Sequence, residues 1–222
     1  MDDLGASSKQ FEIYSRSRLA NLTPLKRVWP WKAWGPYREL TAAEIHEIVM
    51  ICKRAGSRLS FGVTACWVDE HSNLTPYHKK FPEQAAMLQW AVREGFADVV
   101  NHGYTHCRVG KHLPRWCDGN REQHREYVPD MSMAQAASHL LRSQQTFREW
   151  LVPEPSILVP PGLLFADKFL DTAKLAGLRV WNRKDEERCV SLHDKDIVEG
   201  GWVYLRRLVE RETFVTCGEV IA

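Results

Sequence analysis

The sequence lacks the features that mark several large classes of protein. None of its six cysteines forms a Cys-x-x-Cys pair, and each lies in a separate segment, which argues against a zinc knuckle and against a small disulfide scaffold. No apolar run approaches the ~18–20 residues that span a bilayer. The acidic start at Asp2 and Asp3 is unlike the basic, then apolar start of a signal peptide. We therefore expect a cytoplasmic protein with no membrane span.

Neither positive nor negative charge is in marked excess. Thirty Lys and Arg residues face 28 Asp and Glu residues, which leaves a net charge of +2. The basic residues are scattered along the chain, so the sequence gives no electrostatic footprint for nucleic acid or for an anionic membrane. No nucleic-acid partner is therefore expected, and the sequence leaves the oligomeric state open.

The composition is that of one globular domain over residues 1–222. With 44% hydrophobic and 26% charged residues, the chain can bury a core of its own. Helical periodicity alternates with short apolar runs, which predicts an α/β fold with a parallel sheet. Helices are predicted over residues 42–55, 82–94, 132–150, 167–176 and 200–210, and strands over residues 59–68, 97–100, 156–159, 178–181, 189–192 and 213–216.

Two long segments interrupt this alternation. Residues 15–40 are rich in Pro and Trp, with prolines too frequent for a helix and no alternation typical of a strand. They are predicted to form a long structured loop. Residues 107–131 are predicted to form a loop insertion. Loops of this length in a compact domain are usually functional.

The first candidate for chemistry stands where a predicted strand ends. The segment from Asn101 to His106 has the pattern Asn-His-x-x-x-His. A helical turn here would set the imidazoles of His102 and His106 on one side, where both can bind one divalent metal. Such a site needs a third ligand, preferably a carboxylate. Asp2 and Asp3 could supply it, although adjacent acids at a terminus are more commonly a solvated surface pair.

An ordered set of motifs runs through the chain: the pair Asp2-Asp3, the segment Asn101 to His106, the proline loop Leu158 to Gly162, Trp181, Leu192-His193 and the closing Phe214-Val215-Thr216. In this order they resemble the motifs of the NodB-homology polysaccharide deacetylases, carbohydrate esterase family 4, over essentially the whole chain. The resemblance implies a distorted (β/α)7 barrel, a TIM-barrel-like fold, with its final strand at residues 214–216.

The resemblance also implies roles for five residues. Asp3, His102 and His106 would bind a divalent metal, most often zinc. Asp2 would be the general base that takes a proton from water, and His193 the general acid that protonates the departing amine. A metal held by two imidazoles and one carboxylate keeps enough charge to lower the pKa of its water toward ~7 and to polarise an amide carbonyl.

Three features depart from the family pattern. The family commonly has an arginine that holds the catalytic aspartate, whereas this chain has an apolar pair at residues 158–159. A first strand should precede Asp2, but only Met1 does. The chain is therefore predicted to be truncated before that strand, with an unpaired sheet edge and with Asp3 on a mobile terminus. Asp185 stands only loosely where a partner of the acid histidine is expected.

Substrate contacts are predicted from aromatic and forked hydrogen-bonding side chains, which suit the flat faces and hydroxyls of a sugar. The loop from Trp116 to Tyr127, including Asp118 and Asn120, carries such residues. The early loop does so as well, with Trp29, Trp31, Trp34 and Tyr37. For any one aromatic, packing on the barrel surface is at least an equally good interpretation. The candidate substrate-binding residues are Tyr104, Arg121, His124, Pro161 and Trp181.

The sequence thus predicts a metal-dependent carbohydrate deacetylase, a hydrolase of C–N bonds other than peptide bonds. Its substrate would be an N-acetylated sugar or glycan precursor. Two alternatives stay open. One is a related amidase acting on a non-sugar C–N bond. The other is a catalytically inactive barrel that binds glycans or a partner protein, which the missing arginine and the truncated start would favour.

Overall fold

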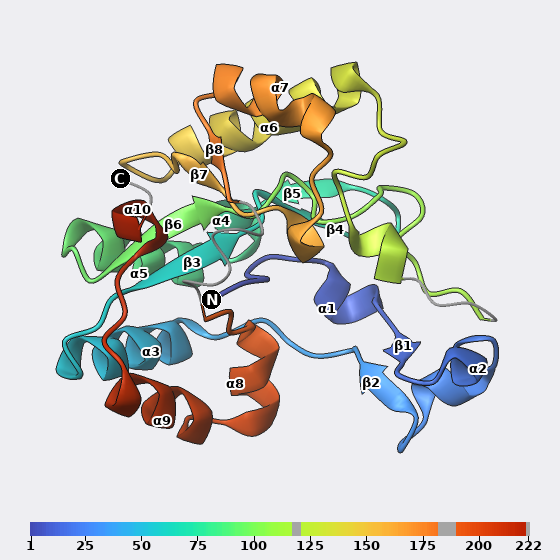
Figure 1. The fold of residues 1–222 in the computed structure, drawn as a ribbon, viewed down its shortest axis with the longest axis horizontal. Helices are drawn as coiled ribbons and strands as arrows, with labels where there is room; N and C mark the ends of the chain where they lie inside the picture. Colours follow the sequence, from blue (N-terminus) through green and yellow to red (C-terminus); the bar gives the residue numbers. More distant parts are fainter. Residues whose placement is uncertain (117–120, 182–189, 221–222) are drawn as a thin grey trace.

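A computed structural model describes residues 1–116, 121–181 and 190–220. At its centre is a four-stranded sheet in the order β3-β6-β7-β8, and every neighbouring pair is parallel. In Figure 1, helices α6 and α7 lie on one side of this sheet and helices α3, α8 and α9 on the other. The strands are β3 (Leu59–Val63), β6 (Ala97–Asn101), β7 (Ile157–Leu158) and β8 (Arg179–Val180). The predicted α/β fold with a parallel sheet is confirmed.

The long helices form where local signals predict them. Helix α3 (Ala42–Arg54) begins with a capping box, in which Thr41 and Glu44 each accept a hydrogen bond from the other's backbone N–H. Its apolar face is buried in the largest core cluster, against β3 and α5 (Pro82–Arg93). Helix α6 (Met133–Arg148) has the same kind of box and packs against α7 (Leu170–Leu175) over a second cluster.

The edge of the sheet beside β3 is not left unpaired. Residues 1–4 lie along β3, where the Gly62 N–H donates to the Met1 carbonyl and the Leu4 N–H to the Gly62 carbonyl. On their other side, the Asp2 N–H donates to the Leu192 carbonyl. Isolated parallel β-bridges therefore flank this segment on both sides, between Leu4 and Val63 and between Asp2 and His193. The expectation of an unpaired edge with Asp3 on a mobile terminus is therefore wrong, because backbone hydrogen bonds on both sides hold these residues.

Three other expectations about the strands and loops need correction. The strand predicted over residues 59–68 is two strands, β3 and β4 (Cys66–Val68), and β4 pairs with β5 (Leu74–Pro76) in a separate antiparallel ribbon. Residues 15–40 include strand β2 (Lys32–Trp34), which pairs antiparallel with β1 (Tyr14–Ser15). The predicted strand over residues 189–192 is not formed in its described part; Leu192 only accepts the hydrogen bond from Asp2.

The C-terminal part also differs from the prediction. Two helices, α8 (Asp194–Gly200) and α9 (Val203–Arg211), replace the single helix expected over residues 200–210. Residues 213–216 form no strand. Their backbone groups are used otherwise, since the Phe214 N–H donates to the Ser57 hydroxyl and the Thr216 N–H to the Glu219 carboxylate.

The remaining elements are short. Among the described residues, no helix is long and apolar enough to cross a bilayer. These short elements are α1 (Ser8–Phe11), α2 (Arg18–Asn21), α4 (Tyr77–Lys80), α10 (Cys217–Val220) and the 3-10 turns Pro24–Arg27, Arg121–His124, Pro161–Leu163 and Asp167–Phe169.

Candidate metal centre and active site

Asp3, His102 and His106 meet at one point of the structure. The Asp3 Oδ1 atom lies 3.3 Å from His102 Nε2 and 3.0 Å from His106 Nε2. One ligand atom from each residue lies within 4.8 Å of the others, and all three residues are buried. The chain thus brings a carboxylate from its first residues to two imidazoles that follow β6.

The backbone around β6 fixes the orientation of His102. Its N–H donates to the Val63 carbonyl of β3, and its ring Nδ1 lies 2.7 Å from the Val159 carbonyl beyond β7. A carbonyl can only accept, so Nδ1 carries the proton and the Nε2 lone pair faces Asp3 when the ring is neutral. This is the arrangement in which a histidine ligand is oriented by a second hydrogen bond.

The electrostatics of the cluster favour an ionised carboxylate between the imidazoles. Burial opposes ionisation of Asp3, but the contacts with His102 and His106, together with the charges of His106 and His193, hold its pKa well below the usual value. Burial also opposes a charge on His102, yet Asp3 and Asp2 raise the pKa of that imidazole. A negative group therefore sits in a site with almost no access to water.

The donor set fits a divalent metal. Two imidazole nitrogens and one carboxylate oxygen are the three protein ligands of many catalytic zinc sites, which keep a further position open. Both ring nitrogens of His106 are buried, and among the described residues Nδ1 makes no hydrogen bond, while Nε2 lies 3.0 Å from Asp3 Oδ1 without the geometry of one. Such a nitrogen is costly to bury unless something else satisfies it. A cation at this point would supply the missing partner.

A buried glutamate, which the sequence argument passed over as part of a sugar-binding loop, organises the turn that carries His106. The Glu126 carboxylate accepts hydrogen bonds from the backbone N–H groups of Tyr104, Thr105 and His106 at 3.0–3.2 Å. It also lies 2.5 Å from His139 Nδ1 of α6. Gly103 has a φ of 89°, and a Cβ atom there would run into this carboxylate. The turn is thus built around one buried anion.

Asp2 precedes Asp3 in the N-terminal segment and lies next to the cluster of Asp3, His102 and His106. Its Oδ2 accepts a hydrogen bond of 2.9 Å from the Ser191 hydroxyl. A Cβ atom on Gly62 would stand 2.8 Å from Asp2 Oδ1 and 3.5 Å from His102 Cγ, so the glycine leaves room for both side chains. Ser191 therefore contacts the carboxylate that the family commonly holds with an arginine. No sequence motif indicated it.

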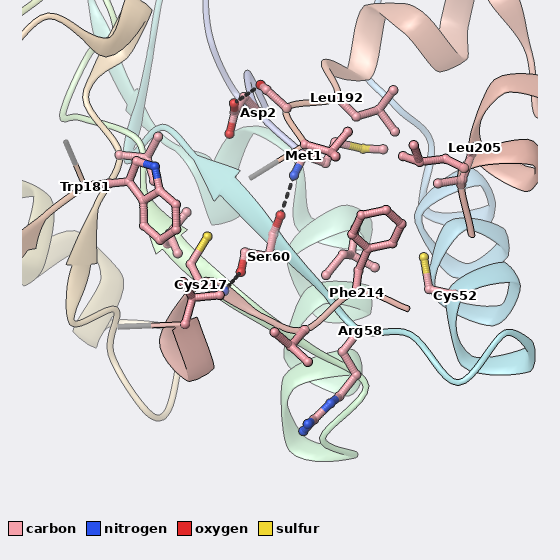
Figure 2. A pocket seen from close by; sticks show the side chains of 18 of the residues that line it. Met1, Asp2, Cys52, Arg58, Ser60, Trp181, Leu192, Leu205, Phe214 and Cys217 are labelled. Carbon is pink, nitrogen blue, oxygen red and sulfur yellow. Dashed lines mark hydrogen bonds between the residues drawn. The ribbon is translucent and has the colours of Figure 1, made fainter. Parts of the chain in front are cut away.

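Asp2 also borders a largely apolar cavity of about 310 Å³, whose lining includes residues of β3, α3 and α9. Figure 2 shows Trp181 on one side of this cavity and Leu205 and Cys52 on the other, with Met1 and Asp2 between them. Trp181 is buried, so its indole lines the cavity and forms part of the wall near Asp2.

His193 lies where α8 begins and is partly exposed. Its Nδ1 is 3.7 Å from Asp196 Oδ2, and its ring meets the edge of Trp34 from β2 at a centroid distance of 6.0 Å. The contact with Asp196 is the main reason that the pKa of His193 rises to about 9, with Asp3 and Asp2 adding to it. The imidazole is therefore protonated at neutral pH.

A buried charge network fixes the backbone next to His193. Lys9 Nζ lies 2.5 Å from both Glu39 Oε2 and Asp194 Oδ2, and the Tyr37 hydroxyl donates to Asp194 Oδ1 at 3.3 Å. Glu39 in turn accepts from the Gly5 N–H. Burial raises the pKa of Asp194 to about 7, although Lys9 opposes this rise. The network ties α1, the start of α8 and the residues after Asp3 into one unit.

The predicted substrate-binding residues differ in exposure. Tyr104 and His124 are buried, and burial together with His106 and His112 lowers the pKa of His124 to about 3. Pro161 is also buried, beside Gly103. The Arg121 side chain is more than half exposed and lies over the Tyr14 ring, 4.0 Å from Glu12. Asp118, Asn120 and Asp185 lie outside the described residues.

The comparisons with known proteins agree with the fold. A family model described as polysaccharide deacetylase matches residues 39–181, whereas no curated protein matches. The structure of BA3943 from Bacillus anthracis, a CE4 family pseudoenzyme, is similar with a TM-score of 0.53 and 12% identity, over 82% of this chain and 62% of that chain. The peptidoglycan deacetylase PdaC from Bacillus subtilis gives a TM-score of 0.52 and 14% identity, over 84% and 85% of the two chains. At such identities these two structures support the fold alone.

Proposed function

Because the chain belongs to the polysaccharide deacetylases of carbohydrate esterase family 4, whose domains are distorted (β/α)7 barrels, we propose that it is a metal-dependent hydrolase. Its reaction is the removal of an acetyl group from an N-acetylated sugar or glycan precursor. The observation that carries this proposal is the convergence of Asp3, His102 and His106 between two further titratable groups, Asp2 and His193.

Each of these residues has a chemical role in the proposal. A divalent metal, most often zinc in such a donor set, would be held by Asp3, His102 and His106 and would supply a Lewis acid for water activation and carbonyl polarisation. Asp2 takes the proton from the attacking water, and its hydrogen bond from Ser191 aims the carboxylate. His193 is protonated at neutral pH and gives its proton to the departing amine.

The rim around the site suits a saccharide. Arg121 offers a fork of donors for sugar hydroxyls. The Trp34 ring is stacked on Tyr14 and has Lys195 over it, so its proposed contribution is to hold the rim beside His193. Tyr104, His124 and Pro161 are too buried to meet a polymer directly, so their proposed contribution is to the walls behind the site. Trp181 lines the cavity beside Asp2 and would bound the space for the acyl group.

The first experiment measures metal content. Purified protein is expected to hold about one divalent ion per chain, with zinc as the main candidate, and His102→Ala is expected to lose it. His71→Ala, which changes an exposed histidine remote from the cluster, is the matched control and should keep the ion. Protein with no divalent ion from about pH 6 to 8 would refute the proposed metal centre.

The second experiment separates the functions. Release of acetate from N-acetylated oligosaccharides supports the deacetylase, whereas release of ammonia from non-sugar amides supports the related amidase. A protein that binds metal but releases neither would be an inactive glycan- or partner-binding barrel. The absence of the family's arginine at residues 158–159 is the observation that favours the inactive barrel. A pseudoenzyme is also among the similar structures.

A further inference from the structure

The segment of residues 14–35 forms a small lobe beyond α1, built from β1, α2, the 3-10 turn Pro24–Arg27 and β2. Figure 1 shows β1, α2 and β2 grouped at one end of the molecule, away from the central sheet. This basic lobe contains five of the chain's 30 basic residues and none of its 28 acidic residues: Arg16, Arg18, Lys26, Arg27 and Lys32. The rest of the chain is therefore net acidic, and the positive charge is concentrated here.

The same lobe exposes large apolar side chains. Leu19 is 78% exposed and Trp29 84% exposed. Isolated exposed apolar residues are normal on a protein surface, but a cluster of this kind marks an interaction site. The exposed members of the basic lobe are Leu19, Leu22, Leu25, Val28, Trp29 and Trp31.

We propose that the basic lobe binds the surface of an anionic lipid bilayer. Trp and Leu side chains enter the boundary between headgroups and acyl chains, while Lys and Arg side chains meet the anionic headgroups. The exposed Arg18 and Lys32 are direct sequence neighbours of the exposed Leu19 and Trp31, so the lobe presents both kinds of side chain that such a boundary requires. The balanced charge of the whole sequence concealed this local excess.

Two other occupants fit the lobe less well. A second copy of the chain would meet the same patch across a two-fold axis, which would place the like charges of the exposed Arg16, Arg18 and Lys32 against each other. A neutral polysaccharide would stack on aromatic rings, but it would leave the exposed Leu19 and Leu22 without a partner. Of these three occupants, only a lipid surface uses the basic and the aliphatic side chains together.

The lobe is joined to the candidate site through β2. Trp34 at the end of β2 contacts His193, and Lys195 lies over the same indole with its Nζ 4.3 Å from the ring centroid. A lobe seated on a bilayer therefore holds the rim of the site close to that surface. The binding itself does not depend on the proposed hydrolysis, so the two proposals can fail separately.

The test is co-sedimentation of the full chain with vesicles. Vesicles of phosphatidylcholine with about 30% phosphatidylglycerol are compared with vesicles of phosphatidylcholine alone. Binding is expected to be at least about tenfold tighter to the anionic vesicles and to weaken as salt is raised, because surface charges are screened.

Two triple variants test the two parts of the lobe. Replacing Arg16, Arg18 and Lys32 by Glu is expected to weaken binding on the order of 100-fold, at about fivefold for each basic residue lost. Replacing Leu19, Leu22 and Trp29 by Ser is expected to reduce binding to a weak, fully salt-sensitive remainder. All six side chains are exposed, so the replacements are expected to leave the fold intact. An unchanged thermal unfolding temperature will check this.

Matched controls change exposed apolar and exposed basic residues elsewhere. Leu141, Val152 and Leu175 are exposed aliphatic residues outside the lobe, and Lys174, Arg179 and Arg211 are exposed basic residues outside it. Their triple replacement by Ser or by Glu should leave vesicle binding within about twofold. Equal losses from the control and lobe variants would overturn the proposal.

Other results would overturn it too. Wild-type protein that stays in the supernatant with anionic vesicles contradicts the lipid surface directly. A dimer in analytical ultracentrifugation that the Leu19, Leu22 and Trp29 variant abolishes, without vesicle binding, would assign the lobe to self-association. Salt-insensitive retention on an insoluble glycan, again without vesicle binding, would assign it to the polysaccharide.

Discussion

Glu126→Gln tests the role of the buried anion behind His106. The native carboxylate accepts three backbone N–H groups and contacts His139. A glutamine keeps one acceptor oxygen, which can retain the bonds from Thr105 and His106, while its NH₂ group faces the Tyr104 N–H. One buried donor then lacks an acceptor and the remaining bonds lose their charge assistance. Together these effects cost about 2–4 kcal/mol.

The loss can be measured in two ways. Urea unfolding of metal-free protein is expected to show this reduction in the free energy of unfolding. For a chain of this length it corresponds to a fall in Tm of about 5–15 °C. Competition with a chromophoric chelator is expected to show zinc affinity about 10–100-fold weaker, since residues that orient a ligand act on affinity at this scale.

Glu122→Gln is the matched control, because Glu122 lies in the same segment but its side chain is 67% exposed and, within the described part of the chain, forms an ion pair only with Arg125. It should change the free energy of unfolding by less than about 0.5 kcal/mol. If Glu126→Gln behaves like this control in both assays, Glu126 does not organise the turn, and the reasoning from its hydrogen bonds is wrong.

Three further predictions concern pH and backbone space. Burial raises the pKa of Glu12 from 4.5 to about 8, so its stabilising contribution is fully present below about pH 4.5 and lost as the pH rises through about 8. In metal-free protein, Glu12→Gln should therefore gain up to about 5 kcal/mol relative to wild type between pH 4 and pH 9 in urea unfolding; a pH-independent difference would contradict this. Asp196→Asn removes the main cause of the raised pKa of His193, so the alkaline fall in acetate release should move to lower pH, and an unmoved profile would exclude His193 as the acid. Gly103→Ala should lose at least about 3 kcal/mol in urea unfolding, whereas Gly110→Ala, with φ 83° but open space around it, should lose only about 1 kcal/mol.

Local signals in the sequence predict the elements that depend on local interactions. Helices α3 and α6 begin at capping boxes and show regular apolar spacing, so their positions follow from short-range chemistry. The apolar β-formers at residues 213–216 mislead the same method. There the hydroxyl of Ser57 binds the Phe214 N–H from a distant position, which no local pattern reveals. The carboxylate of Glu219 binds the Thr216 N–H in a Thr-x-x-Glu pattern before α10, a local signal that the strand prediction overlooked.

The candidate site divides in the same way. The motifs indicate Asp3, His102 and His106 because those residue types carry the chemistry themselves. No motif identifies the residues that support them, because these contacts join distant parts of the sequence. Ser191 binds Asp2 across 189 positions, and Lys9 binds Asp194 across 185 positions. The sequence does show that Glu126 is an acidic residue in a loop of polar and aromatic side chains. Only the structure shows that this carboxylate is buried and binds the His106 N–H.

The pairing of Asp2 with residues 192–194 has a consequence for how the protein matures. Asp2 and Leu192 are 190 positions apart in the sequence, yet their backbones are hydrogen-bonded, and contacts between such distant positions form late in folding. The Asp2 carboxylate therefore stays solvated until the segment that carries Leu192 has been synthesised and has docked beside it. The general base of the proposed reaction is in place only after these two segments have met, so a partly folded chain would lack it.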